Sequence, residues 1–255
     1  MPSSAAIHWV EQGLVPDRVV RLGIRRLLRQ PLAEGHSGDA AASAAVTQAF
    51  VHDMRNARIA LHPDKANAQH YELPAPFFEG VLGPRLKYSC CLWPQGDDGT
   101  LAQAEVAALA QTCEHAQLAD GQEVLELGCG WGSLSLWIAE HFPRSRITAV
   151  SNSASQRAFI ERRAKTRGLD NLKVLTQDFN TFEGPSGRYD RIVSVEMFEH
   201  LRNWPRAFGH VARWLRPGGK FFMHVFAHRD APYAFEVRDV SDWMSQYFFT
   251  GGMMP

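Results

Sequence analysis

The feature that most constrains the fold is a glycine-rich segment between two apolar patterns. Residues 124–127 have the composition of a buried strand, Gly128-Cys-Gly-Trp-Gly132 follows, and residues 134–141 have a helical pattern. A strand, a glycine turn and a helix in this order are typical of parallel α/β sheets, where the turn approaches a ligand closely. The segment therefore predicts both the fold class and the place of a ligand site.

Strand and helix patterns alternate beyond this turn. We expect strands at residues 146–150, 173–176, 190–195 and 220–225, and helices at residues 100–115, 155–167 and 204–215. Such alternation predicts a doubly wound, mostly parallel α/β sheet of the Rossmann-like type with helices on both faces. We assign residues 99–255 to this domain.

Residues 1–98 are expected to form a helical subdomain followed by a loop that covers the ligand. A helical pattern extends over residues 5–60 with a break at Gly35-His-Ser-Gly38, and residues 71–93 are rich in proline and predict an ordered loop. One expected helix places apolar residues on one face and arginines on the other, namely Val20, Ile24, Leu27 and Leu28 against Arg18, Arg21, Arg25, Arg26 and Arg29. The arginines fit either a solvated face of a packed helix or peripheral docking on anionic lipid or an acidic partner.

Charge and cysteine content exclude several classes of protein. The 27 basic and 27 acidic side chains cancel, so no overall field attracts nucleic acid. The four cysteines have neither zinc-site spacing nor the density of a disulfide scaffold, and we see no signal peptide and no apolar run of membrane-spanning length. We expect a soluble cytoplasmic protein without a metal centre; its oligomeric state is left open.

The residues around the turn indicate which ligand it binds. Ser133 replaces the third glycine of a dinucleotide fingerprint, and the second strand ends in Ser151-Asn152 rather than in an acid, which disfavours a nicotinamide cofactor. Glu126 suits a cofactor with cationic groups, because a carboxylate repels phosphates. S-adenosylmethionine fits. Ser151, Asn152 and Gln156 could bind its ribose; Asp178 and Phe179 could bind and stack on its adenine, although Asp178 could instead only form a turn.

An acid and a histidine that follow the fourth predicted strand suggest how an acceptor is activated. An alkylamine is mostly protonated near neutral pH and then has no lone pair with which to attack a methyl group. Glu199 and His200 follow that strand at the carboxyl edge of the sheet, where open α/β folds bind ligands. Together they could bind the cation and remove its proton.

Several segments resemble the family that joins cyclopropane-fatty-acid synthases with coclaurine-type N-methyltransferases, which have the class I methyltransferase fold. They are Lys87-Tyr-Ser-Cys-Cys91, the glycine turn with its strand, Ala149-Val-Ser-Asn-Ser-Ala-Ser-Gln156, Ser194-Val-Glu-Met-Phe-Glu-His-Leu-Arg-Asn203 and Phe249-Thr-Gly-Gly-Met-Met-Pro255. Leu14-Val-Pro-Asp17 and Tyr71-Glu-Leu-Pro74 are similar to the coclaurine-type branch. That similarity favours N-methylation of a small amine over modification of a lipid.

The resemblance implies roles for individual residues. Tyr88 and Ser89 would close over S-adenosylmethionine, and Ser151 and Gln156 would bind its ribose. Gly128 and Gly130 would receive its methionine portion, and Gly132 of the same turn is a further cofactor-binding candidate. In the amine branch, residues matching Glu196, Glu199 and His200 bind and deprotonate the acceptor. In the cyclopropane branch, residues matching Cys90, Glu199 and His224 hold a bicarbonate that acts as the base.

Both branches therefore remain open, with a small amine or an unsaturated acyl chain as the acceptor. A third hypothesis is a fragment that binds the cofactor but is inactive. Family members continue beyond the position of Pro255, so we expect the C-terminal part of the fold and part of the acceptor site to be absent.

Overall fold

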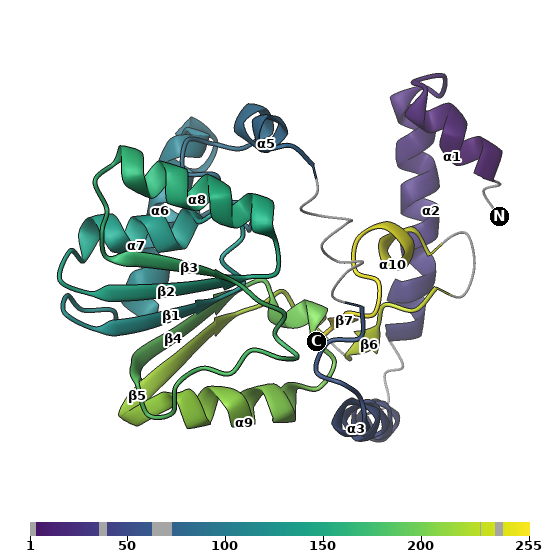
Figure 1. The fold of residues 1–255 in the computed structure, drawn as a ribbon. Coiled ribbons are helices and arrows are strands. Elements are labelled where there is room, and N and C mark those ends of the chain that lie inside the picture. Colours follow the sequence, from purple (N-terminus) through teal and green to yellow (C-terminus); the bar gives the residue numbers. More distant parts are fainter. Residues whose placement is uncertain (1–3, 36–39, 63–72, 230, 238–241) are drawn as a thin grey trace.

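The structure is a computed structural model that describes residues 4–35, 40–62, 73–229, 231–237 and 242–255. The expected break at residues 36–38 and the Tyr71-Glu72 part of the coclaurine-like motif lie outside these ranges. The N-terminal region contains the expected helices, α1 (Ser4–Glu11), α2 (Asp17–Gly35) and α3 (Ala40–Asn56). Figure 1 shows α1 and α2 set apart from the sheet, and the C-terminal region contains the short helix α10 (Trp243–Tyr247).

A five-stranded parallel sheet forms the centre of the molecule, in the order β3-β2-β1-β4-β5. Its strands are β1 (Glu123–Leu127), β2 (Arg146–Ser151), β3 (Leu172–Thr176), β4 (Tyr189–Val195) and β5 (Leu215–His224). Its helices are α6 (Leu101–His115), α7 (Ser133–His141), α8 (Ala154–Thr166) and α9 (Trp204–Trp214). Figure 1 shows α7 and α8 on one face and α9 on the other. The order reverses between β1 and β4, which is where open sheets of this kind bind ligands.

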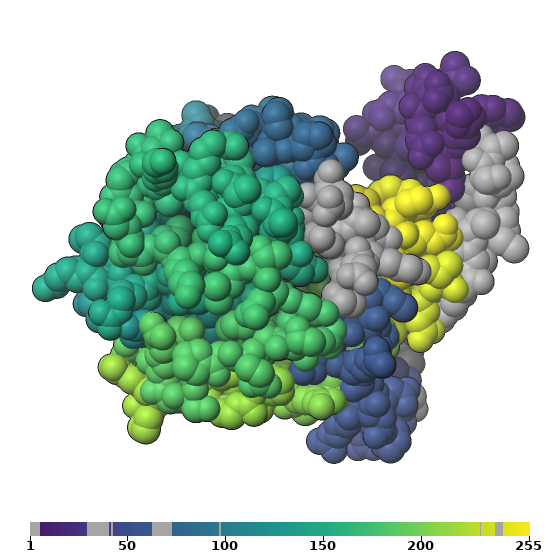
Figure 2. All heavy atoms as spheres, viewed as in Figure 1, coloured from purple at the N-terminus to yellow at the C-terminus, as the bar shows by residue number. Residues whose placement is uncertain are grey.

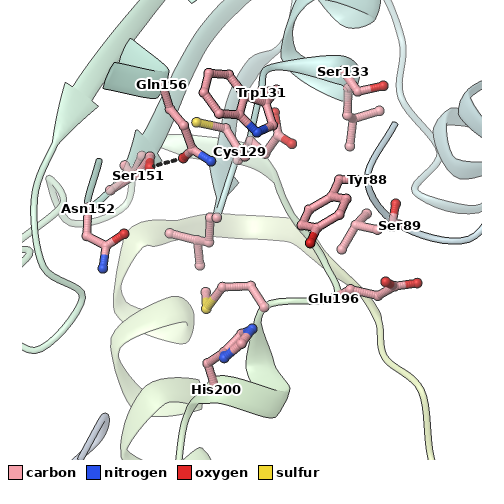
Figure 3. A pocket seen from close by; sticks show the side chains of 18 of the residues that line it. Tyr88, Ser89, Cys129, Trp131, Ser133, Ser151, Asn152, Gln156, Glu196 and His200 are labelled. Carbon is pink, nitrogen blue, oxygen red and sulfur yellow. Dashed lines mark hydrogen bonds between the residues drawn. The ribbon is translucent and has the colours of Figure 1, made fainter. Parts of the chain in front are cut away.

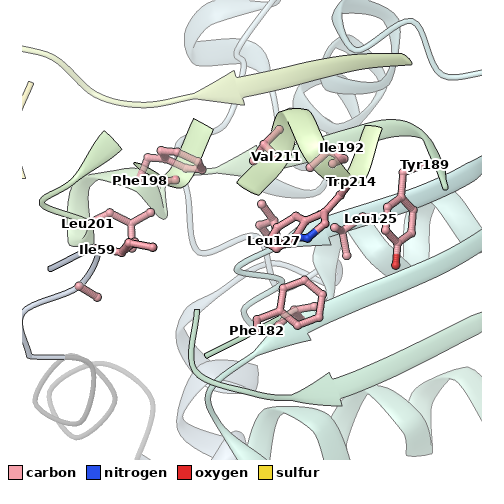
Figure 4. Packing of buried hydrophobic residues seen from close by; sticks show 13 residues of the cluster. Ile59, Leu125, Leu127, Phe182, Tyr189, Ile192, Phe198, Leu201, Val211 and Trp214 are labelled. Atoms are coloured by element: carbon pink, nitrogen blue, oxygen red, sulfur yellow. The ribbon is translucent and has the colours of Figure 1, made fainter. Parts of the chain in front are cut away.

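Apolar side chains fill both sides of this sheet. Figure 4 shows the cluster on the α9 side, where Leu125, Leu127 and Ile192 of the strands pack near Trp214 of α9. Ile59 from the segment after α3 belongs to the same cluster. The segment after α3 therefore packs into the same hydrophobic core as the sheet, in addition to being covalently continuous with it.

Local sequence signals explain the helix starts. Thr100 precedes α6, and its Oγ1 accepts a hydrogen bond from the Gln103 N–H at 3.3 Å, while the Thr100 N–H donates to Gln103 Oε1 at 2.9 Å. This capping box satisfies two backbone donors that the first turn leaves free. The expected start at Thr100 is confirmed.

Two predicted boundaries are wrong. β5 begins at Leu215 rather than at residue 220. Leu215 pairs with Tyr189 and Lys220 with Arg191 of β4, and the residues between them, including Pro217-Gly-Gly, form an irregularity in this pairing that still belongs to the strand. The proline-rich stretch predicted as a loop contains helix α5 (Ala75–Val81), which begins after Pro74 and has a proline in its first turn. Proline is compatible with the first helical turn, so here it marks a helix start.

The C-terminal region adds a small antiparallel ribbon that the sequence patterns did not predict. It pairs β6 (Tyr233–Ala234) with β7 (Met253–Met254). Two short 3-10 helices, η1 (Gly96–Asp98) and η2 (Phe198–His200), complete the described elements. Gly252, just before β7, lies so close to the backbone of Glu199 that a side chain there would reach within 2.5 Å of the Glu199 carbonyl oxygen. The ribbon therefore packs directly on the segment predicted to hold the acceptor.

The apolar face of α2 is largely exposed. Ile24, Leu27 and Leu28 are 50%, 42% and 54% exposed, and the arginines on the other face are exposed as well. Figure 2 shows this helix protruding from the remainder of the molecule. Within the described residues, this apolar face is therefore not packed against the rest of the chain, and both interpretations of the arginines stay open. None of the helices in the described ranges is long and apolar enough to cross a membrane.

Candidate functional site

The glycine turn after β1 combines tight packing with open space. Gly128, Gly130 and Gly132 have φ angles of 78°, 52° and 79°, which non-glycine residues rarely adopt. A Cβ at Gly128 would lie 2.5 Å from Met197, and one at Gly132 would lie 2.6 Å from Ile160. A Cβ at Gly130 would meet no protein atom within 4 Å. Gly130 thus leaves room that a ligand can fill.

A cavity of about 380 Å³ opens beside this turn, at the carboxyl edge of the sheet. Most of the predicted site residues line it, namely Tyr88, Ser89, Glu126, Gly128, Gly130, Ser151, Asn152, Gln156, Asp178, Phe179, Glu196 and His200. Figure 3 shows Ser151, Asn152 and Gln156 toward one end, and Tyr88 and Glu196 toward the other. Gly132, Glu199, Cys90 and His224 are outside the lining formed by the described residues.

The end of β2 presents polar groups toward the cavity. Ser151 Oγ donates a hydrogen bond to Gln156 Oε1 at 2.6 Å (Figure 3), which fixes the orientation of the amide. The Gln156 Nε2 is buried and has no hydrogen-bond partner among the described residues. Buried polar groups normally find partners. Ligand hydroxyl groups would supply them, which fits the predicted ribose site.

Glu126 lies buried at the end of β1, beneath the turn. Burial raises the pKa of its carboxyl to about 7, while a hydrogen bond from Ser135 Oγ and the nearby Lys87 ammonium oppose this shift. A buried carboxylate is stabilised strongly by a cation. The ammonium of S-adenosylmethionine is such a cation, so the residues around the turn fit this cofactor.

Asp178 follows β3 and serves the local turn as well as lining the cavity. Its Oδ1 accepts a hydrogen bond from the Asn180 N–H at 2.8 Å. Phe179 packs edge-on against Trp214, with ring centroids 6.0 Å apart, and so belongs partly to the core. Asp178 thus takes part in the local turn, and its contact with adenine stays a prediction.

The loop that carries Tyr88 and Ser89 is held by two residues that the sequence patterns did not single out. Glu105 of α6 is fully buried and accepts hydrogen bonds from the backbone N–H groups of Arg85 and Lys87, both at 2.9 Å. The Lys87 Nζ donates to Ser89 Oγ at 2.5 Å and to the Cys90 carbonyl oxygen at 2.7 Å. The available signal was an acid on the apolar face of α6, beside Ala104, Ala108 and Leu109.

Glu199 lies in η2 and is completely shielded from solvent. Its Oε1 accepts a hydrogen bond from the Phe226 N–H at 2.8 Å. Burial, and to a lesser degree the charge of Glu196, raises the pKa of its carboxyl to about 7. His200, the next residue, faces the cavity and stacks on Phe249 with a centroid distance of 5.0 Å. The imidazole thus lines the cavity, whereas the neighbouring Glu199 carboxyl is buried outside its lining.

Cys90 and His224 lie close together, and Glu196 is the acid beside them. The Cys90 Sγ lies 3.8 Å from His224 Nε2, and the Cys90 N–H donates to Glu196 Oε1 at 3.1 Å. The ligating atoms of these three residues all lie within 4.8 Å of one another. The residues expected to hold a bicarbonate, Cys90, Glu199 and His224, are not such a group within the described ranges, and that role stays a prediction.

Known proteins resemble this chain over most of its length. The family model described as mycolic acid cyclopropane synthetase matches residues 61–255. The (S)-coclaurine N-methyltransferase of Thalictrum flavum subsp. glaucum is 38% identical over 245 residues, covering 96% of this chain and 67% of that protein. The cyclopropane-fatty-acyl-phospholipid synthase of Escherichia coli (strain K12) is 35% identical over 189 residues, covering 73% of this chain and 46% of that protein.

Solved structures show the same two branches. A crystal structure of coclaurine N-methyltransferase bound to N-methylheliamine and SAH superimposes with a TM-score of 0.92 and 35% identity, covering 99% of this chain and 74% of the other. A mycolic acid cyclopropane synthase complexed with SAH and CTAB has a TM-score of 0.62 and 25% identity, covering 78% and 72%. The overall fold is thus shared with both.

Proposed function

The chain belongs to the mycolic acid cyclopropane synthetase family, and we propose that within it this protein transfers a methyl group to the nitrogen of a small amine. It is an S-adenosylmethionine-dependent methyltransferase with the class I fold, as the sequence predicts. The finer assignment, which concerns the acceptor, rests on the acids and the imidazole beside the cavity.

The observation that carries the proposal is the concentration of negative charge at the acceptor side. Glu196 lines the cavity, and the buried Glu199 directly precedes His200 in η2. Carboxylates in a shielded site attract a cation and disfavour an anion. An alkylammonium is the acceptor form that such a site recognises. The similarity to a coclaurine N-methyltransferase over 96% of the chain supports the same assignment.

The cofactor would supply a methyl group bound to a sulfonium. In-line attack on this methyl group breaks its bond to sulfur, and the sulfur leaves as a neutral thioether. The residues of this chain would hold it. Glu126 lies where it can attract the ammonium, Gly130 provides space for the chain of the methionine portion, and Gln156 offers its free amide hydrogens to the ribose. The Tyr88-Ser89 loop would exclude water from the reacting end.

The amine needs to lose one proton before or as it gains the methyl group. His200 faces the cavity and can accept that proton on its ring, and Glu199 can stabilise the resulting positive charge. Glu196 would bind the incoming ammonium and orient its nitrogen. The aromatic stack of Phe249 on His200 limits rotation of the imidazole.

A screen with labelled S-adenosylmethionine tests this proposal. Cyclic and aromatic secondary amines should accept label, and His200→Ala should lower kcat/KM by about 10²-fold or more without changing the affinity for SAH. His52→Ala, an exposed histidine of α3, is the matched control and should retain activity. Label transfer that is insensitive to His200 would contradict the assignment. Complete inactivity towards all acceptors would instead favour the cofactor-binding fragment.

A second candidate is methylation or cyclopropanation of an unsaturated acyl chain. The exposed apolar face of α2 beside its arginines favours it, because such a helix can bind an anionic membrane surface. This reaction would use a bicarbonate base near Cys90 and His224, yet the Glu196 carboxylate already stands there and would repel an anion. Label entering vesicles of phosphatidylglycerol with unsaturated chains would support this candidate over the amine.

A further inference from the structure

Three different ligand types converge at the rim of the cavity. Cys90 belongs to the loop that covers the turn, Glu196 follows β4, and His224 ends β5. Cys90 is exposed, whereas the other two are half-buried, so the group can be reached from solvent. One thiol, one carboxylate and one imidazole thus face a common point.

Their spacing fits a tetrahedral metal ion. Zinc bound to sulfur at roughly 2.3 Å and to imidazole nitrogen at roughly 2.0 Å places those two atoms about 3.5 Å apart. The Cys90 Sγ and His224 Nε2 are 3.8 Å apart, and the Glu196 oxygen lies within 4.8 Å of both. Small side-chain rotations would therefore complete the coordination. The fourth position would be left for water.

The donor set selects a class of ion. Thiolate and imidazole favour zinc and similar late transition metals, whereas magnesium and calcium prefer oxygen ligands alone. On binding, the thiol releases its proton to solvent, and the thiolate and carboxylate together neutralise the two charges of the ion. The complex is then neutral as a whole, although the Lys87 ammonium lies close, bonded to the Cys90 carbonyl oxygen.

We propose that Cys90, Glu196 and His224 form a binding site for a zinc-class divalent ion, and that its occupancy inhibits the enzyme. The inhibitory part rests on the proposed amine methylation. Glu196 cannot ligate a metal and receive an ammonium at the same time, so the ion and the amine would compete. The site itself depends only on the three side chains.

Binding can be measured without any methyl acceptor. Metal-free protein titrated with Co²⁺ should develop a thiolate-to-cobalt charge-transfer band in the near ultraviolet at one ion per chain, and Zn²⁺ should remove it. Cys90→Ser should abolish the band, and His224→Gln should weaken binding by at least about tenfold. Cys91→Ser is the matched control, since its thiol is the neighbouring one but is not part of the group, and it should retain the band.

Inhibition is measured separately. Zn²⁺ should raise the apparent KM for the amine, and a chelator should return this KM to its metal-free value. The Zn²⁺ concentration needed for inhibition should be at least about tenfold higher in Cys90→Ser than in Cys91→Ser. A band that is absent, or that depends on Cys91 rather than Cys90, would overturn the site. A Cys90-dependent band without competition against the amine would overturn the inhibitory role. A band in a protein that methylates no amine would leave the site standing and count against the proposed function.

Discussion

The Glu199 carboxyl group accepts the backbone N–H of Phe226 at 2.8 Å through Oε1, while its buried Oε2 finds no partner among the residues described. Half of this acid is therefore anchored to the segment after β5, and the other half is unsatisfied. An unsatisfied buried oxygen is costly when it carries charge. The arrangement keeps the carboxyl near its point of ionisation in neutral solution.

This ionisation should be visible in the pH dependence of turnover. Burial raises the pKa of Glu199 to about 7, so the carboxylate needed to stabilise a cationic acceptor is lost below that pH. We expect kcat/KM to rise with pH through about 7. This rise of kcat/KM with pH should persist in the residual activity of His200→Ala and disappear in Glu199→Gln. If Glu199→Gln leaves the rise of kcat/KM unchanged, the titrating group is a different residue.

The same shift predicts how stability varies with pH. The folded pKa lies above the ordinary value of 4.5, so the folded state keeps its proton where the unfolded chain has lost it. The contribution of Glu199 to the free energy of unfolding is thus fully present below pH 4.5 and is lost up to about pH 7, by at most about 3 kcal/mol. Urea unfolding at pH 4.5, 6 and 7.5 should show a smaller decline in Glu199→Gln than in the parent protein. Equal declines would rule out a shifted Glu199.

Two glycines of the turn, Gly128 and Gly130, should respond differently to alanine. Gly128→Ala adds a methyl group 2.5 Å from the Met197 side chain and should destabilise the fold by about 2 kcal/mol or more. Gly130→Ala places its methyl group in open space, so it should cost only about 1 kcal/mol of backbone strain while weakening SAH binding at least about tenfold. Thermal unfolding and calorimetric titration of SAH distinguish the two effects. Strong SAH binding by Gly130→Ala would place the cofactor elsewhere.

Much of the sheet could be predicted because its signals are local. The strand composition around Leu125 and Ile192, and the cap at Thr100, need no knowledge of distant contacts. The pairing of Cys90 with Glu196 rather than Glu199 could not be predicted in this way, because it joins residues 106 positions apart and depends on the unusual backbone of Glu196, which has a φ of 50°. Side-chain direction at a strand end is set by such backbone angles, which sequence spacing does not reveal.

Glu105 allows a test of how the covering loop is held. Glu105→Leu removes the acceptor for the Arg85 and Lys87 N–H groups, and leaving buried donors unpaired costs about 1–3 kcal/mol each. The loop should open, so the KM for S-adenosylmethionine should rise more than kcat falls. Glu114→Leu, an exposed acid on the same helix, is the matched control. If both variants change the cofactor KM equally, the loop is not positioned by Glu105.

Asn203 links the N-terminal region to α9. Its side chain both caps the helix and binds the N-terminal region, and substitutions can distinguish these two contributions to stability. Its Oδ1 accepts the Arg206 N–H at 3.0 Å and caps α9, while its Nδ2 donates to the carbonyl oxygens of Arg55 and Ala57 at 3.0 Å and 2.9 Å. Asn203→Ala should lose both functions and destabilise the protein by about 2–4 kcal/mol, whereas Asn203→Asp keeps the cap and loses the donors.

Because an aspartate would also face two carbonyl oxygens, the helix start should survive in Asn203→Asp while the attachment of the N-terminal region weakens. Hydrogen exchange would then increase at residues 55–60 but not at the first turn of α9, and Asn203→Ala would increase it at both. Asn56 is exposed, and among the described residues its side chain bonds to His52 of the same helix, so Asn56→Ala should change neither. Faster exchange in α9 alone would mean that Asn203 contributes only as a helix cap, and that the shared core at Ile59 holds the N-terminal region without it.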